Sequence, residues 1–155
     1  MEPKIWYFAY GSNMNSKRLK ERVNRNDIRW QVGYLQGYEL VFNKVGSDGS
    51  GKANIRRKEP SSVYGVLYLL TEEELQRLDK HEGVPNHYKR ICLPVETEAG
   101  TVQAISYIAA EGKVREGLRP RCDYLEHLIK GAEEHSLPEN YIRQLKSVQC
   151  FDGDD

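Results

Sequence analysis

The order in which strand and helix patterns follow one another constrains the fold of this chain more than any other feature. Seven short segments enriched in β-branched and aromatic residues fill the first two thirds of the 155 residues. These predicted strands are residues 5–10, 30–35, 38–43, 53–57, 63–70, 91–97 and 101–108. Helical patterns dominate the rest. Strands first and helices last predict an α+β fold and not alternating βαβ units.

Helical patterns occupy four segments, and the second of them has the clearest boundaries. It begins at Thr71, whose spacing to Glu74 forms a capping box, and it ends near Gly83, a residue type that commonly follows a helix. Ser136 and Glu139 predict a second capping box before the last helix. The four segments are residues 15–23, 71–83, 123–135 and 138–147.

Two glycine-containing links between strands predict different kinds of connection. Residues 98–100 are short enough for a hairpin between the last two strands. Residues 46–52 carry three glycines in seven positions, which is typical of a mobile loop. Such a loop could serve as a lid over a ligand.

Length and charge favour one domain that binds a small molecule. We expect one domain over residues 1–150, large enough for a core with a pocket, and a disordered tail at 151–155. The 23 basic and 23 acidic residues cancel, so nothing global indicates a nucleic acid or an anionic membrane as partner. No apolar run approaches the ~20 residues of a membrane span, and the first residues do not open a signal peptide. We therefore expect a cytoplasmic protein; no exposed apolar stripe indicates its oligomeric state.

The cysteines and histidines favour neither a metal nor a cofactor. Cys92, Cys122 and Cys150 are odd in number, lie far apart and form no CxxC motif, which indicates neither a disulfide framework nor a zinc site. They are most simply buried thiols that act as small hydrophobic groups. The four histidines form no H-E-x-x-H motif, and phosphate-binding glycine motifs are absent, so we expect no metal and no nucleotide cofactor.

Residues 7–14 form a strand, a loop and a helix start, because an apolar run breaks at Gly11 and a charged helical pattern follows. Glycine lets a backbone approach a ligand closely, and free N–H groups at a helix start can hold a carboxylate or a polarised carbonyl. Lys17, Arg18 and Lys20 lie in the early turns, where acidic residues would suit the helix dipole better. They indicate either an anionic ligand or ordinary solvated surface charges.

Glu82 is the candidate general base. It lies where the second helix ends, and a carboxylate near the negative end of a helix dipole has a raised pKa if it is also partly desolvated. Such a carboxylate can act as a base near neutral pH. The simpler interpretation is an exposed glutamate before a C-cap glycine. Ser12 does not lie in a G-x-S-x-G elbow, so the sequence does not support a serine hydrolase.

Three motifs in combination resemble those of the γ-glutamylcyclotransferase-like family, which also includes γ-glutamylamine cyclotransferases. The motifs are residues 7–14 (YFAYGSNM), 64–68 (YGVLY) and 78–85 (LDKHEGVP). The resemblance continues through Tyr107, Tyr124 and Gly131, and so spans nearly the whole chain. It implies a small closed mixed β-barrel with flanking helices and a pocket at one barrel end.

The resemblance also implies a reaction. The α-amine of a γ-glutamyl group attacks its own γ-carbonyl, which closes 5-oxoproline and expels an amine or amino acid. Glu82 matches the family's catalytic glutamate, which would serve as general base and then as general acid. The substrate-binding residues that the resemblance predicts are Tyr7, Phe8, Ala9, Tyr10, Gly11, Ser12, Asn13, Tyr107 and Tyr124. For both Tyr107 and Tyr124, core packing with a satisfied hydroxyl is the alternative to substrate orientation.

Two further interpretations stay open. A non-catalytic binding module could keep the pocket for an amino-acid-like ligand, although an idle carboxylate would be a liability in a pocket for an anion. An enzyme of this class could instead release a γ-glutamyl-linked amine or a lysine side chain. We place the leaving-group end at residues 46–52 and 112–119, where Lys52, Lys113 and Arg115 would suit a carboxylate.

Overall fold

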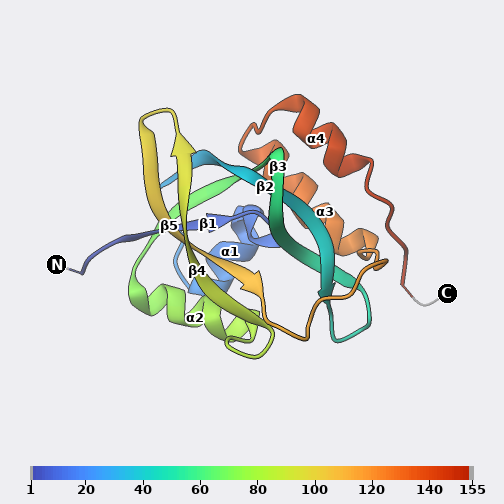
Figure 1. Cartoon of the computed structure of the whole chain (residues 1–155). Helices are drawn as coiled ribbons and strands as arrows, with labels where there is room; N and C mark the ends of the chain where they lie inside the picture. Colours follow the sequence, from blue (N-terminus) through green and yellow to red (C-terminus); the bar gives the residue numbers. More distant parts are fainter. Residues whose placement is uncertain (1, 154–155) are drawn as a thin grey trace.

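The computed structural model describes residues 2–153, and five strands in it close into a barrel (Figure 1). The strands are β1 (Ile5–Ala9), β2 (Trp30–Val45), β3 (Gly51–Leu70), β4 (Tyr88–Thr97) and β5 (Gly100–Ala109). They follow one another around the barrel in the order β1, β3, β2, β4 and β5. β1 runs parallel to β5, whereas the other neighbouring pairs are antiparallel. The structure therefore confirms the predicted closed mixed barrel.

β2 and β3 are longer than predicted, because each joins two of the expected strands. The pairing register between them shifts where β2 passes from Gln36 to Tyr38 and β3 passes from Ser62 to Arg57. Gly37 lies in this irregularity with a φ of 82°, a conformation that suits glycine. The breaks in the sequence pattern therefore mark a bulge within one ladder and not the ends of strands.

The helical elements lie outside the barrel. They are the 3₁₀ turn η1 (Ser12–Met14) and the helices α1 (Ser16–Val23), α2 (Glu72–Glu82), α3 (Cys122–Glu134) and α4 (Glu139–Lys146). The capping box of Thr71 and Glu74 is present at the start of α2, as predicted. The second predicted box is wrong, because Pro138 is the N-cap of α4 and no side chain caps that helix. Ser136 instead adopts a φ of 56° in the preceding turn. None of the helices within residues 2–153 is long and apolar enough to cross a membrane.

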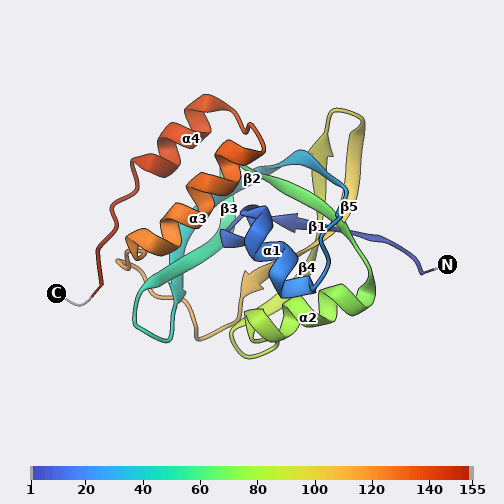
Figure 2. The same cartoon turned by 180° about the vertical axis from the view of Figure 1, so that it is seen from behind.

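α3 packs closely against the turn that follows β1. Figure 2 shows α1 between α3 and α2 on one side of the barrel. A Cβ atom at Gly131 of α3 would lie 2.3 Å from the backbone carbonyl carbon of Met14 and 2.5 Å from the amide nitrogen of Asn15. Only glycine permits this approach, which lets η1 pack directly against α3.

The cysteines differ from the prediction. Cys122 and Cys150 form a disulfide, and Cys92 is exposed, so the expectation of three buried thiols is wrong. The pair is 28 residues apart and meets only because the chain returns past α4 to the start of α3. The prediction of a disordered tail from residue 151 onward is also wrong for Phe151. Phe151 donates a backbone hydrogen bond to Pro120 O at 3.1 Å and accepts one from Cys122 N at 2.8 Å. Residues 154–155 of that tail lie outside the described part.

The glycine-rich segment 46–52 forms a hairpin turn between β2 and β3. The N–H of Gly46 donates to Ser50 O at 2.8 Å, and the N–H of Gly49 donates to Gly46 O at 2.9 Å. Asp48 Oδ1 accepts from the Ser50 hydroxyl at 2.6 Å, and Ser50 is 1% exposed. The turn is therefore internally hydrogen-bonded, and its motion as a lid stays a prediction.

Candidate active site

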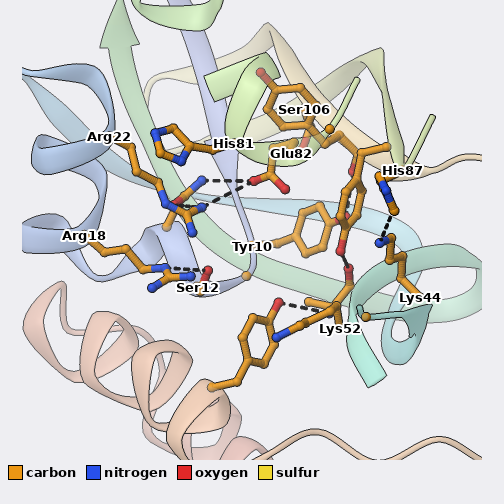
Figure 3. A pocket seen from close by; sticks show the side chains of 18 of the residues that line it. Tyr10, Ser12, Arg18, Arg22, Lys44, Lys52, His81, Glu82, His87 and Ser106 are labelled. Carbon is orange, nitrogen blue, oxygen red and sulfur yellow. Dashed lines mark hydrogen bonds and ion pairs between the residues drawn. The ribbon is translucent and has the colours of Figure 1, made fainter. Parts of the chain in front are cut away.

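A cavity of about 320 Å³ opens at one end of the barrel. It is bordered by the ends of β1, β2 and β5, the starts of β3 and β4, and by α1, the last turn of α2 and the first turn of α3. Figure 3 shows Glu82 near its centre, with Arg18 and Arg22 on one side and Lys44 and His87 on the other. The folding of the chain thus places the predicted catalytic residue in a pocket at a barrel end.

Glu82 is a partly buried residue of this cavity and not an ordinary surface glutamate. It is the last residue of α2, and the chain turns away at Gly83, whose φ is 66°. The side chain of Glu82 is 18% exposed, and its Oε1 accepts a hydrogen bond from Asn13 Nδ2 at 3.2 Å. Arg22 Nη1 lies 3.9 Å from the same oxygen. The carboxylate is therefore oriented by residues from the loop after β1 and from α1.

Asn13 connects the groups around Glu82. Its amide nitrogen donates to the carboxylate and also to the hydroxyl oxygen of Tyr7 at 3.0 Å, which uses both of its protons. Its carbonyl oxygen accepts from Arg22 Nη1 at 3.1 Å. Asn13 itself is 3% exposed. The network is consequently satisfied within the protein and fixes the direction of the carboxylate before any ligand binds.

Burial controls the protonation of Glu82. Desolvation raises the pKa of its carboxyl group above the usual value, and the nearby cations Arg22, Arg18 and Lys44 oppose that rise without cancelling it. The Asn13 hydrogen bond acts in the same direction as the cations. A carboxylate whose pKa is raised is a stronger base than an exposed one, and its pKa lies closer to the working pH, which suits a group that first accepts and later returns a proton.

The four tyrosines of the predicted site divide into two pairs. The hydroxyl of Tyr10 donates to Tyr107 O at 2.6 Å, and the hydroxyl of Tyr107 donates to Asp79 Oδ1 at 2.6 Å, so both are committed to the protein. The hydroxyl oxygens of Tyr7 and Tyr124 instead accept hydrogen bonds, in the second case from the Ala53 N–H at 3.0 Å. Burial raises the pKa of Tyr124 to about 12, which keeps its hydroxyl protonated. Tyr7 and Tyr124 therefore keep a proton to donate.

The structure brings most of the predicted binding residues to the cavity, but not all of them. Those that line it are Tyr7, Tyr10, Gly11, Ser12, Asn13, Glu82, Tyr107 and Tyr124. Phe8 and Ala9 do not, which corrects the prediction for them. Successive side chains of a strand point to opposite faces, so Phe8 points away from the face that Tyr7 occupies, and it is fully buried in the core. Ala9 is 1% exposed and packs in the same core.

Basic residues surround the cavity, and sequence reasoning identified only some of them. Of the three early cations of α1, only Arg18 lines the cavity, and its Nε donates to Ser12 Oγ at 3.1 Å. Lys17 is exposed to solvent. Arg22 was missed, although it lies four residues after Arg18 and thus on the same helix face. Lys52 lines the cavity as predicted, whereas Lys113 and Arg115 line a neighbouring one.

Other cavity residues gave no signal in the sequence. Lys44, His81 and His87 all line the cavity, and only the closed barrel brings them together. Within residues 2–153, no group of three or more histidine, cysteine or acidic side chains is placed to hold a metal ion. The arrangement is that of a small-molecule site in which one carboxylate is the candidate acid and base.

A closed mixed barrel with the Glu82 carboxylate in a cavity at one end indicates a small barrel enzyme. Comparisons with known proteins identify its family. The model of the AIG2-like family matches residues 62–145. A γ-glutamylcyclotransferase from Bos taurus is 32% identical over 152 residues, which cover 94% of this chain and 79% of that protein. One from Homo sapiens is 31% identical over 158 residues, with 97% and 82% covered.

A solved structure supports the same assignment. That structure, of a γ-glutamyl cyclotransferase, superposes with a TM-score of 0.88 at 28% identity and covers 98% of this chain and 92% of its own. The chain belongs to the γ-glutamylcyclotransferase-like, or AIG2-like, family of enzymes. The resemblance found in the sequence motifs is confirmed.

Proposed function

We propose that this protein is a γ-glutamyl cyclotransferase that converts a γ-glutamyl compound into 5-oxoproline and a free amine or amino acid, with Glu82 as general base and then general acid. The observation that carries the proposal is the partly buried carboxylate of Glu82, which Asn13 and Arg22 orient inside the cavity. The γ-glutamylcyclotransferases among the relatives support the class of reaction.

The reaction exchanges one C–N bond for another within a single molecule. Glu82 takes a proton from the α-ammonium group, and the freed amine attacks the γ-carbonyl carbon. In the tetrahedral intermediate the attacking nitrogen gives up its second proton to become the lactam N–H. The bond to the leaving nitrogen breaks as Glu82 returns a proton to it, and the second proton also passes through Glu82 to the released amine, which leaves as an ammonium. Neither an oxidant nor a second substrate is needed. Because nucleophile and electrophile belong to one molecule, a pocket that holds the substrate folded supplies much of the acceleration.

We assign the α-carboxylate of the γ-glutamyl group to Arg18. Its Nε is bonded to Ser12, while no acceptor within residues 2–153 occupies its terminal N–H groups. A guanidinium group pairs well with a carboxylate through two parallel hydrogen bonds. Since Arg18 and Arg22 lie on one side of Glu82 (Figure 3), this placement sets the neighbouring α-ammonium beside the base.

Backbone amides of the loop after β1 are the donors that we assign to the oxyanion. The first hydrogen bond of η1 runs from Met14 N to Gly11 O at 3.0 Å. The N–H groups of Gly11, Ser12 and Asn13 precede it, and amides at such a start have no partner within the helix. The free proton of the Tyr124 hydroxyl adds one more donor. Preorganised donors of this kind stabilise the charge that develops on the carbonyl oxygen.

The test is the release of 5-oxoproline, followed by NMR with a panel of γ-glutamyl amino acids and γ-glutamyl amines. We expect turnover by the wild type, and a loss of about 10²- to 10⁴-fold in kcat for Glu82→Gln, because that variant removes the base but keeps the shape. Glu73→Gln on the same helix is the matched control, since Glu73 is exposed, and it should retain full activity.

Two outcomes would contradict the proposal. Equal turnover by wild type and Glu82→Gln would remove Glu82 from the chemistry. Binding of the compounds without any 5-oxoproline would instead support a non-catalytic binding module, in which Glu82 contacts the ammonium group of the ligand.

A further inference from the structure

Lys44 is a buried cation at the end of β2 that forms no ion pair with a carboxylate of residues 2–153. The residue is 5% exposed. Its ammonium nitrogen lies 3.0 Å from Nδ1 of His87 and 5.3 Å from the centre of the Tyr88 ring. An ammonium group has three N–H donors, and the imidazole takes one of them. The remaining donors have no hydrogen-bonded acceptor in the part of the chain that the structure describes, although the side chain borders the cavity.

Burial and the nearby Lys113 lower the pKa of Lys44, and its hydrogen-bonded partner does not offset its charge. The positive charge of Lys44 lowers the pKa of His87, so the imidazole stays neutral and accepts the hydrogen bond at Nδ1. A buried charge is costly unless it is paired, and here the protein supplies a neutral partner and an aromatic face where a carboxylate would neutralise the charge. An anionic group on a bound molecule would complete this environment.

His87 fixes the distance between Lys44 and the catalytic candidate. Its backbone N–H donates to Gly83 O at 2.8 Å, and a Cβ atom at Gly83 would meet the His87 ring at 2.8 Å. Gly83 directly follows Glu82. The ammonium group is therefore held on the opposite side of Glu82 from Arg18 and Arg22, as Figure 3 shows.

A second cavity extends the site beyond Lys44. This outer cavity has a volume of about 400 Å³ and shares Gly46, Ser47 and His87 with the first. Its wall includes Lys113 and Arg115, neither of which forms an ion pair with a carboxylate of the described residues. The positive potential therefore continues outward from Lys44.

The backbone holds this cationic wall in place. The N–H of Val45 donates to Lys113 O at 2.8 Å, and the N–H of Arg115 donates to Asn43 O at 2.8 Å. Residues 113–115 thus pair with the end of the strand that carries Lys44. The outer cavity is therefore a built part of the site and not a gap beside a free loop.

We propose that Lys44, positioned by His87, is the specificity-determining residue that binds an anionic group on the leaving part of the substrate, and that the outer cavity receives the rest of that part. The selected substrates are γ-glutamyl compounds whose leaving amine carries a carboxylate, as an amino acid or a peptide does, in preference to simple amines. This inference rests on the proposed function, since it names the substrate class of the same site.

Two compounds that differ by one carboxylate test the inference: γ-glutamylalanine and γ-glutamylethylamine. We expect the wild type to prefer γ-glutamylalanine by about 10- to 100-fold in kcat/KM, the range that a hydrogen bond to a charged group supports. Lys44→Met keeps the length of the side chain and should abolish this preference, mainly by raising KM for γ-glutamylalanine. It should leave γ-glutamylethylamine within about threefold.

Two control variants keep the result specific. Lys44→Arg retains the charge and should restore most of the preference, while Lys89→Met, on the exposed part of β4, should behave as wild type. A wild type that treats the two compounds alike overturns the inference without any variant. An equal effect of Lys44→Met on both compounds overturns it as well.

Failure of the proposed function can be told apart from failure of this inference. If no 5-oxoproline forms from either compound, the proposed reaction is wrong. Calorimetric binding of the same two compounds then still decides the role of Lys44. Tighter binding of γ-glutamylalanine that is lost in Lys44→Met supports the inference, and equal affinities contradict it.

Discussion

The two sides of the cavity satisfy their charges in opposite ways. At the Glu82 side, Asn13 donates to the carboxylate at 3.2 Å and accepts from Arg22 at 3.1 Å, so both Glu82 and Arg22 have a protein partner. At the Lys44 side, His87 is the one hydrogen-bonded partner of the ammonium group within residues 2–153. The carboxylate of Glu82 is oriented in the free protein, whereas we propose that a ligand neutralises Lys44.

This difference separates two tasks within one pocket. Under the proposed function, the base must be held in one orientation with a defined pKa before the substrate arrives, and the network around Glu82 is suited to this. A specificity site must gain more from the correct ligand than from an incorrect one, and a cation without a neutralising partner does that.

The disulfide between Cys122 and Cys150 tests how far the stability of the fold depends on the segment after α4. Cys150→Ser opens a link that spans 28 residues and should lower the free energy of unfolding by about 3 kcal/mol, or Tm by roughly 6–12 °C. We expect a smaller effect on kcat, because Glu82 and its partners lie in other elements and Tyr124 is the one proposed catalytic group beside the disulfide. Thermal unfolding with and without a reductant measures the effect.

The wild type in reductant should unfold like Cys150→Ser. A strong loss of kcat at a temperature where the variant is folded would show instead that the disulfide orients the catalytic side of the pocket.

Gly131 tests the Glu82 side of the cavity, because it packs against the turn that carries Asn13. Gly131→Ala places a methyl group within 2.3 Å of the Met14 backbone and should push α3 away from η1. We expect a loss of about 1–3 kcal/mol in stability from overpacking, together with a lower kcat, because the loop carries Asn13. Activity assays well below the unfolding temperature separate the two effects. Full kcat in a destabilised variant would show that the loop keeps its shape without this contact.

Much of the fold was predictable from the sequence, because its local signals agree with the final structure. The Thr71 capping box, the end of the same helix at Glu82 and the hairpin at residues 98–100 depend on residues close in the chain. The disulfide and Lys44 could not be predicted, since each depends on segments that meet only after the barrel closes. Phe8 was misassigned because a motif was carried over as a block, although a strand alternates its side chains.

The cations on the two sides of the cavity, Arg22 and Lys44, lower the pKa of Glu82 to different extents. Profiles of activity against pH can measure the difference. Its pKa is raised by burial, so activity that needs the ionised base should fall as the pH drops through a value above that of ordinary glutamate. Arg22 opposes this rise more than Lys44 does. Arg22→Met should therefore move the acidic limb of kcat/KM to higher pH, and Lys44→Met should move it less.

Profiles of kcat/KM from about pH 4 to about pH 8 measure the acidic limb of both variants. At the acidic end we expect Arg22→Met to lose roughly tenfold in kcat/KM, because fewer molecules carry the ionised base. A larger displacement in Lys44→Met than in Arg22→Met would mean that the base is coupled mainly to the specificity side.

The smallest effect should come from Tyr107, whose hydroxyl belongs to the protein and not to the pocket. Tyr107→Phe removes the 2.6 Å hydrogen bond to Asp79, while Arg90 keeps its ion pair with that carboxylate at 2.8 Å. The expected cost is about 1 kcal/mol in the free energy of unfolding, with kcat within about threefold of wild type. Tyr124→Phe is the matched comparison, because its hydroxyl has a proton to offer a ligand; it should lower kcat/KM with less effect on stability. If Tyr107→Phe instead lost activity at unchanged stability, its hydroxyl would have to turn from Asp79 to the substrate, and the catalytic side would not be complete before the ligand binds.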